Sequence, residues 1–194
     1  NGKFYYLYLF MDIWSRKIVG QEVHENEDME KSSRLIEKIY EQENLKNGDV
    51  KLHSDNGGPM KGATMLVTLQ KLGIVPSFSR PKVSDDNAFS ESLFKTLKYC
   101  PQYPSRPFQS LENARSWVEE FVYWYNFKHL HSGIKFGTPN SRHLGEDDKI
   151  LEKRKEVYKK AKIKNPNRWS KEIRNWDKIK KVELNGLQED KILD

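Results

Sequence analysis

Short apolar stretches within the first 80 positions, bounded by polar residues and glycines, predict four β-strands. Residues 4–13 are aromatic or aliphatic on both faces, which predicts a strand buried on both sides. A turn at residues 15–17 follows, and residues 18–23 predict an antiparallel partner strand. Two further short strands are predicted over residues 49–55 and 74–79, separated by a glycine-containing loop.

Helical spacing of apolar residues predicts four helices, over residues 29–43, 62–72, 87–98 and 111–125. Asp85 and Asp86 directly precede the third of these helices. We expect them to act as N-terminal caps, because negative charge is favourable at a helix N-terminus. Strands followed by alternating helices and strands predict a mixed α/β domain.

Charge divides the chain into two parts. Residues 149–194 carry 15 lysines and arginines against 8 acidic residues, whereas residues 1–148 carry 19 against 20. We therefore predict a core domain over residues 1–145 and a basic helical extension over residues 146–194. The extension is expected to hold one helix over residues 149–164 and a second helix capped by Ser170. It fits either a contact with the DNA backbone or a docking or oligomerisation helix.

Composition excludes several classes of protein. With 36% hydrophobic and 12% aromatic residues, the chain can bury a core and is not disordered throughout. The single cysteine, Cys100, excludes a disulfide framework and a cysteine-based zinc module. No run of about 18 apolar residues occurs, so the sequence predicts no membrane partner. No phosphate-binding P-loop and no convincing nucleophilic set of residues is present.

Two acidic residues stand where metal chemistry would need them. Asp55 ends a predicted strand and opens a glycine loop, and Glu91 lies near the start of a predicted helix, with 35 residues between the two acids. Carboxylates that converge on one point are ligands that Mg²⁺ prefers, and Lys95 and Lys98 would share the face of Glu91. Taken alone, such a pair is better explained as a helix cap and a surface acid, because 28 acidic residues supply many pairs at any given spacing by chance.

Three blocks of sequence resemble one family in the right order. They are HSDNGG (53–58), SRPKVSDDNAFSESLFKTLK (79–98) and YNFKHLHSGIKFGTP (125–139). The combination is similar to the catalytic core of bacterial insertion-sequence transposases of the DDE type, which are related to retroviral integrases. The resemblance runs from residue 4 to residue 139. It implies an RNase H-like fold, with a five-stranded mixed sheet and flanking helices.

The resemblance also implies a site and an activity. Asp55 and Glu91 match two of three catalytic carboxylates, which hold Mg²⁺ or Mn²⁺ in a two-metal site. Lys95, Lys98, Arg80 and His131 match positions expected to contact DNA. The implied activity is cleavage and strand transfer of DNA at transposon ends and target. The implied setting is a homo-oligomer on DNA, in the bacterial cytoplasm near the nucleoid.

The sequence departs from the family pattern at one catalytic position. The first catalytic aspartate belongs on a strand ahead of residue 4, and that strand is not among these residues. Asp12 matches a non-catalytic position, so we do not assign it to the site. We expect the chain to be a fragment with little activity alone; the alternative is an inactive remnant that at most binds DNA. His129 also stands where the family usually has arginine, which weakens the expected grip on DNA there.

Overall fold

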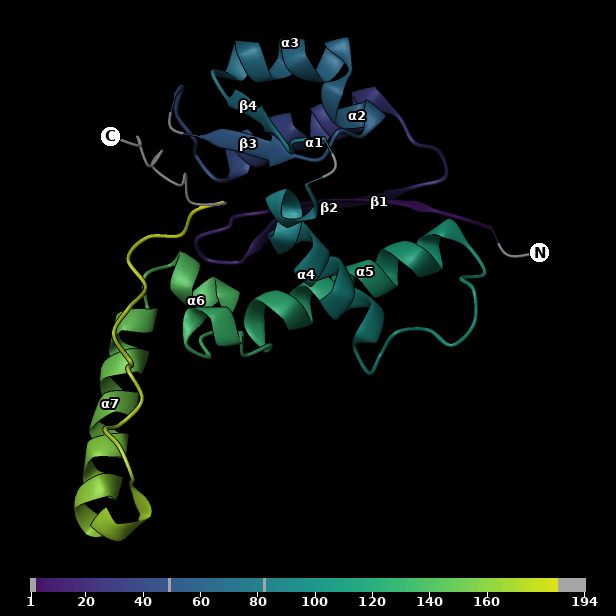
Figure 1. The fold of residues 1–194 in the computed structure, drawn as a ribbon. Helices are drawn as coiled ribbons and strands as arrows, with labels where there is room; N and C mark the ends of the chain where they lie inside the picture. Colours follow the sequence, from purple (N-terminus) through teal and green to yellow (C-terminus); the bar gives the residue numbers. More distant parts are fainter. Residues whose placement is uncertain (1–2, 49, 82, 185–194) are drawn as a thin grey trace. The chain divides into compact units, whose positions relative to one another are not determined.

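A computed structural model describes residues 3–48, 50–81 and 83–184, with the backbone alone at residues 84 and 85 (Figure 1). The chain forms two compact units. Unit 1 contains the segment up to Met11 and residues Val19–Phe121, and unit 2 contains Asp12–Ile18 and Val122–Val182. The predicted boundary at residue 145 falls inside unit 2. The division into a core domain and a basic extension stays a prediction. No described helix combines the length and apolar character needed to span a membrane.

The predicted strands form two separate pairs in the described part of the chain. Strand β1 (Tyr6–Met11) pairs with β2 (Ile18–His24), and β3 (Lys51–Ser54) pairs with β4 (Val75–Phe78). The second pair is parallel, with Lys51 opposite Val75 and Ser54 opposite Phe78. Among the described strands, β1 and β3 therefore share no neighbour, and the implied five-stranded sheet is present here as two two-stranded sheets.

Helices α1 (Met29–Gln42), α2 (Gly58–Lys61) and α3 (Ala63–Leu72) build the core of unit 1. Asp28 caps α1 by accepting a hydrogen bond from the backbone N–H of Glu30. Buried residues of α1 and α3 pack against side chains from β1 and from the start of the β4 segment: Phe10, Leu35, Ile36, Ile39, Met65, Leu69 and Ile74. This apolar cluster fixes the two helices against the strands that lead to the candidate site.

The 3-10 helix η1 (Ser84–Asn87) leads directly into α4 (Ala88–Tyr99). The expected cap by Asp86 is wrong, because Asn87 is the N-cap residue and makes no side-chain capping hydrogen bond. Asp86 is buried and instead accepts hydrogen bonds from the backbone and guanidinium of Arg80. A charged guanidinium is a stronger partner than a helix N–H, so the loop takes the carboxylate. The side chain of Asp85 lies outside the described residues.

Unit 2 is organised around a buried arginine. It contains the C-terminal end of α5 (Leu111–Phe127), η2 (Ser132–Ile134), α6 (Pro139–His143), α7 (Asp147–Lys164) and η3 (Pro166–Arg168). The Arg142 side chain is fully buried, and its Nε donates to the carbonyl of Trp14 at 2.8 Å. Its guanidinium also lies 4.5 Å from the centre of the Trp14 ring. These contacts join the turn after β1 to α6.

A left-handed bend precedes α6. Lys135 and Phe136 have φ angles of 58° and 61°, a backbone region that residues other than glycine rarely adopt. Arg154 on α7 donates hydrogen bonds to both of their carbonyl oxygens, at 2.6 and 2.8 Å. The bend is therefore held by a guanidinium that comes from a different helix.

The basic extension holds one of its two predicted helices. Helix α7 confirms the first, but the helix expected after Ser170 is wrong, since residues 171–184 form no helix. We call residues 169–182 the strap, because they run back beside α7 (Figure 1). Arg142 donates a hydrogen bond of 2.7 Å to the carbonyl of Ile179, which a helix would have used internally. The buried Trp176 ring packs on Tyr158 of α7, with ring centres 5.1 Å apart.

Candidate active site

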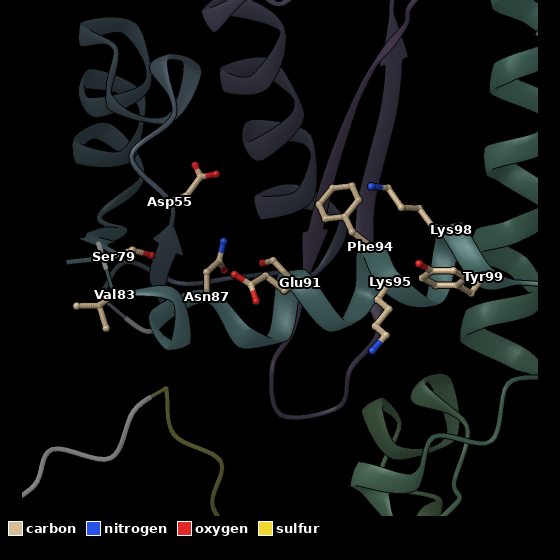
Figure 2. A pocket seen from close by; sticks show the side chains of 10 residues that line it. Asp55, Ser79, Val83, Asn87, Glu91, Phe94, Lys95, Lys98 and Tyr99 are labelled. Carbon is tan, nitrogen blue, oxygen red and sulfur yellow. The ribbon is translucent and has the colours of Figure 1, made fainter. Parts of the chain in front are cut away.

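A cavity of about 600 Å³ lies in unit 1 beside α4 (Figure 2). Its lining comes from the ends of β3 and β4, the following loop, η1 and α4: Asp55, Ser79, Val83, Asn87, Ser90, Glu91, Phe94, Lys95, Lys98 and Tyr99. Four of the predicted site residues are thus brought to one cavity, namely Asp55, Glu91, Lys95 and Lys98. Arg80 and His131, the other two, are not among its lining residues.

Asp55 reaches the cavity because it directly follows β3. Parallel strands place their carboxyl ends at the same edge of a sheet, so Asp55 after β3 and Ser79 after β4 both lie there. One carboxylate oxygen of Asp55, Oδ1, accepts a hydrogen bond from the backbone N–H of Gly57 at 3.0 Å. A Cβ on Gly57 would lie 3.0 Å from that oxygen, so a larger residue at this position would crowd the Asp55 carboxylate.

Two neighbouring residues brace this end of β3. Asn56 donates from Nδ2 to the carbonyl of Ser79 at 3.0 Å, which ties the glycine loop to the end of β4. His53 lies opposite Ser77 in the strand pair, and its ring nitrogens contact the hydroxyls of Ser77 at 3.0 Å and Ser79 at 3.3 Å. His53 therefore acts across the strands as a positioning residue for the cavity wall.

Helix α4 delivers the other acid and both lysines. Leu93 and Leu97, four residues apart, are buried, so the helix face that carries them is directed toward the protein interior. At 3.6 residues per turn, Glu91, Lys95 and Lys98 fall on the opposite face, and all three side chains are exposed. The aromatic side chains of Phe94 and Tyr99 line the same cavity and are 39% and 78% exposed.

The chemistry of this cavity suits a divalent cation in part. Carboxylate oxygens of Asp55 and Glu91 are hard donors, and both open onto the same space. Within the residues that the structure describes, no group of three or more histidine, cysteine or acidic side chains is arranged to hold a metal ion. The described residues thus contribute two carboxylates to such a site, and the lysines add positive charge beside them.

Comparison with known proteins identifies the fold. Models of the integrase core domain match residues 1–84 and residues 72–139, so that together they account for the chain up to residue 139. The chain belongs to the integrase-core family. The RNase H-like fold expected from the sequence is thereby confirmed, and the matched region contains every residue that lines the cavity.

The curated relatives of this integrase core are bacterial transposases. The chain is 29% identical to the transposase for insertion sequence element IS904 of Lactococcus lactis, over 69% of this chain and 53% of the relative. It is 27% identical to the putative transposase InsK for insertion sequence element IS150 of Escherichia coli, over 72% of this chain and 48% of the relative. The chain thus spans about half the length of each.

A solved structure shares the fold of this integrase core at low sequence identity. It is the simian T-cell lymphotropic virus intasome in complex with PP2A regulatory subunit B56 gamma. The TM-score is 0.51 at 16% identity, over 66% of this chain and 44% of that one. At this identity the likeness concerns the fold alone.

Arg80 holds the loop that precedes α4. Its Nε and Nη2 donate to the two carboxylate oxygens of Asp86 at 3.0 and 2.9 Å, a bidentate pair. The hydrogen bonds that Arg80 donates to Asp86 raise the pKa of Arg80, whose side chain stays 68% exposed. Arg80 therefore keeps its charge while its guanidinium orients the start of the helix that carries Glu91. A contact with DNA stays a prediction for this residue.

His131 lies in unit 2, where it is half-buried. Burial, together with the charge of Arg16 and neighbouring His129, lowers the pKa of His131 to about 4. Its Nδ1 accepts a hydrogen bond from the backbone N–H of Gly133 at 3.1 Å. Burial also lowers the pKa of His129. Both imidazoles are therefore neutral at pH 7, and the contact predicted for His131 with DNA would rest on hydrogen bonding.

Asp12 has a structural role in unit 2. Its carboxylate accepts hydrogen bonds from the backbone N–H groups of Trp14 and Ser15 and from the Ser15 hydroxyl. Burial raises its pKa, but hydrogen bonds from His143, from Ser15 and from the backbone outweigh this and lower the pKa to about 2. The Asp12 carboxylate closes the turn after β1, and its assignment as a non-catalytic position stays a prediction.

Proposed function

We propose that this integrase core is the catalytic part of an insertion-sequence transposase, which cleaves and joins DNA phosphodiesters with Mg²⁺ or Mn²⁺. The observation that carries the proposal is the shared cavity of Asp55 and Glu91, two acids from separate elements, with Lys95 and Lys98 beside them. The names of the curated relatives support transposition as the process. Their bacterial sources also support the expected cytoplasmic, nucleoid-associated location.

Each residue at the cavity has a role in this proposal. Asp55 and Glu91 would hold the cation, and the Gly57 N–H orients the Asp55 carboxylate. Bound divalent cations would supply activation of the attacking oxygen and stabilisation of the leaving oxygen. Lys95 and Lys98 would bind phosphates of the DNA strand and steady it against the two acids. The substrates would be transposon ends and target DNA, bound by a homo-oligomer.

A complete site needs one more strand in this proposal. The family resemblance puts a first catalytic aspartate on a strand between β1 and β3, and these strands belong to separate two-stranded sheets here. Since two-metal chemistry depends on the full ligand set, we expect residues 1–194 alone to transfer strands poorly. A protein that includes the further strand is expected to be active.

The test is a strand-transfer assay on the parent-length protein with Mg²⁺ or Mn²⁺. We expect Asp55→Asn and Glu91→Gln each to reduce product below detection, because each removes a charged metal ligand. Glu37→Gln is the matched control, since Glu37 is an exposed acid on α1 that does not line the cavity. Full activity in both cavity variants would overturn the site assignment. Strand transfer by residues 1–194 at the parental rate would overturn the need for a further ligand.

Metal binding can be measured without activity. Titrating Mn²⁺ into the chain 1–194 should broaden the NMR signals of Asp55 and Glu91 before those of the rest of unit 1. Glu91→Gln should remove this early broadening, and Glu37→Gln should not. Uniform broadening across the chain would contradict a metal site at this cavity. A parent-length protein that binds DNA but shows neither activity nor local broadening would be an inactive remnant.

A further inference from the structure

The cations of α7 fall into two groups, those that pair with residues of the strap and those that do not. On the face that the strap covers, Lys155 donates to Asp177 at 3.0 Å and Lys162 pairs with Glu172 at 2.9 Å. The hydrogen bond that Lys155 donates to Asp177 raises the pKa of Lys155. The positive charges on this face of the helix are therefore matched by acids of the strap.

Other cations beside the strap are matched in the same way. Lys178 of the strap pairs with Asp147 at 2.9 Å, at the start of α7. Arg154 gives its hydrogen bonds to the two carbonyls of the left-handed bend and lies 5.6 Å from the centre of the Trp176 ring. The cations Lys155, Lys162 and Arg154 on the inner side of α7 thus each have a partner, and the Trp176 ring packs against this side.

The outer side of α7 carries a different set of lysines. We call Lys149, Lys153, Lys160 and Lys164 the lysine stripe; all four are exposed. At 3.6 residues per turn they fall within an arc of about 60°, opposite the face that packs on the strap, and span about 23 Å. None of the ion pairs found in the described part of the chain involves them. Glu156 is the acid of α7 that lies nearest this arc.

An unmatched row of lysines costs the helix some stability, because like charges four residues apart repel each other. A polyanion offsets this cost. Duplex DNA carries a phosphate every 3.4 Å or so along each strand, so a stripe of about 23 Å faces several phosphates of one strand. The stripe has few apolar or hydrogen-bonding groups that would read base edges, which favours contact with the backbone alone.

We propose that the lysine stripe of α7 binds the phosphate backbone of duplex DNA without sequence preference. The proposal builds on the proposed function by adding a second DNA contact in unit 2, made by residues other than those that line the cavity of Asp55 and Glu91 in unit 1. The contact uses only the outer side of α7, because the acids of the strap pair with the cations on the inner side.

The experiment measures binding of the chain 1–194 to a random-sequence duplex of about 20 base pairs by fluorescence anisotropy, from 50 to 200 mM NaCl. EDTA is present, so metal binding does not contribute. Each lysine that neutralises a phosphate adds about 0.9 to the slope of log affinity against log salt. The fourfold variant Lys149→Gln, Lys153→Gln, Lys160→Gln, Lys164→Gln is expected to lower this slope by about 3. Its affinity should fall about tenfold or more at low salt.

A matched control removes the same charge from unit 1. Lys38→Gln, Lys46→Gln, Lys51→Gln and Lys71→Gln together change four exposed lysines and should lower the slope by less than about 1. Glutamine keeps the helix propensity of lysine, and circular dichroism verifies that α7 is intact in the stripe variant. Equal losses in the two fourfold variants would overturn the proposal, since net charge alone would then explain them.

Two further outcomes separate this proposal from others. In a chain that also carries Asp55→Asn, the stripe substitutions should still lower the salt slope by about 3, so a failed active site and a failed stripe give different results. Val157 and Ile163 flank the stripe and are 55% and 80% exposed, which would suit contact with a second copy. A stripe variant that changes the mass measured by light scattering while leaving the salt slope unchanged would overturn DNA binding in favour of that contact.

Discussion

Helices α4 and α7 both present lysines to solvent, but in different electrostatic surroundings. On α4, Lys95 and Lys98 share a cavity with Glu91 and Asp55, so positive and negative groups line one space. On α7, the acids of the strap engage the inner cations, and the lysine stripe faces outward alone. The position of the neighbouring acids therefore decides what a lysine can do. The first arrangement suits a reaction on a bound phosphate, and the second suits sequence-independent adhesion.

The largest expected effect concerns the packing of Trp176, which holds the strap beside α7. Trp176→Ala removes a buried ring that packs on Tyr158 and should cost unit 2 about 3 kcal/mol or more in free energy of unfolding. Trp169→Ala is the control, because Trp169 is only half-buried and contacts the same Tyr158 ring at 5.9 Å. Urea denaturation followed by circular dichroism measures both. Equal losses would mean that Trp176 is no special anchor of the strap.

The next effect concerns the pH dependence of unit 2. The pKa of Asp12 is lowered from 3.8 to about 2 in the folded chain, so its carboxylate stabilises the fold above pH 4. This stabilisation, on the order of 2 kcal/mol, is lost as the pH falls from about 4 to about 2. Asp12→Asn should therefore lower the free energy of unfolding at pH 6 and make little difference at pH 2. A deficit that stays constant between these pH values would contradict the role given to ionised Asp12.

The smallest expected effect returns to the cavity beside α4. Gly57→Ala puts a Cβ at 3.0 Å from Asp55 Oδ1, so the carboxylate must shift by a few tenths of an ångström. We expect strand transfer by the parent-length protein to fall several-fold, because catalytic groups tolerate little displacement. Gly58→Ala is the control, since its Cβ would meet no atom within 4 Å. Similar activity in the two variants would show that the position of Asp55 is not critical.

The sequence predicted most of unit 1 because its signals are local. Apolar spacing located α1, α3, α4 and the four strands, and the glycine loop located the end of β3 at Asp55. The meeting of Asp55 and Glu91 at one cavity depends on the strand pairing, which spacing alone leaves open. Family resemblance supplied that step, and the cavity residues Phe94 and Tyr99 went unnoticed because exposed aromatic residues carry no motif.

The two wrong helix predictions, the cap by Asp86 and the helix after Ser170, share one physical cause. In each, an arginine outside the predicted helix makes a hydrogen bond with a group that the helix would have used. Asp86 had the sequence position of a helix cap, but Arg80 offered it a bidentate ion pair. The helix predicted after Ser170 had suitable apolar spacing. There, Trp176 packs on α7, and the Ile179 carbonyl accepts a hydrogen bond from Arg142. Arg142 lies 37 residues from Ile179, and Arg80, although only six residues from Asp86, makes a pair that the spacing of apolar residues does not reveal.

The bend at Lys135 and Phe136 has a consequence for which substitutions the chain can accept. A β-branched residue such as valine or isoleucine at either position would clash with its own backbone at a φ near 60°, whereas glycine or asparagine would fit. Main-chain shape restricts both positions, and the side chains add contacts of their own: Lys135 Nζ donates to the carbonyl of Asn175 at 3.0 Å, and the Arg174 guanidinium lies 4.9 Å from the centre of the Phe136 ring. Arg154 contacts the bend through carbonyl oxygens that every amino acid possesses, so a residue that tolerates this φ can replace either one without loss of the Arg154 hydrogen bonds.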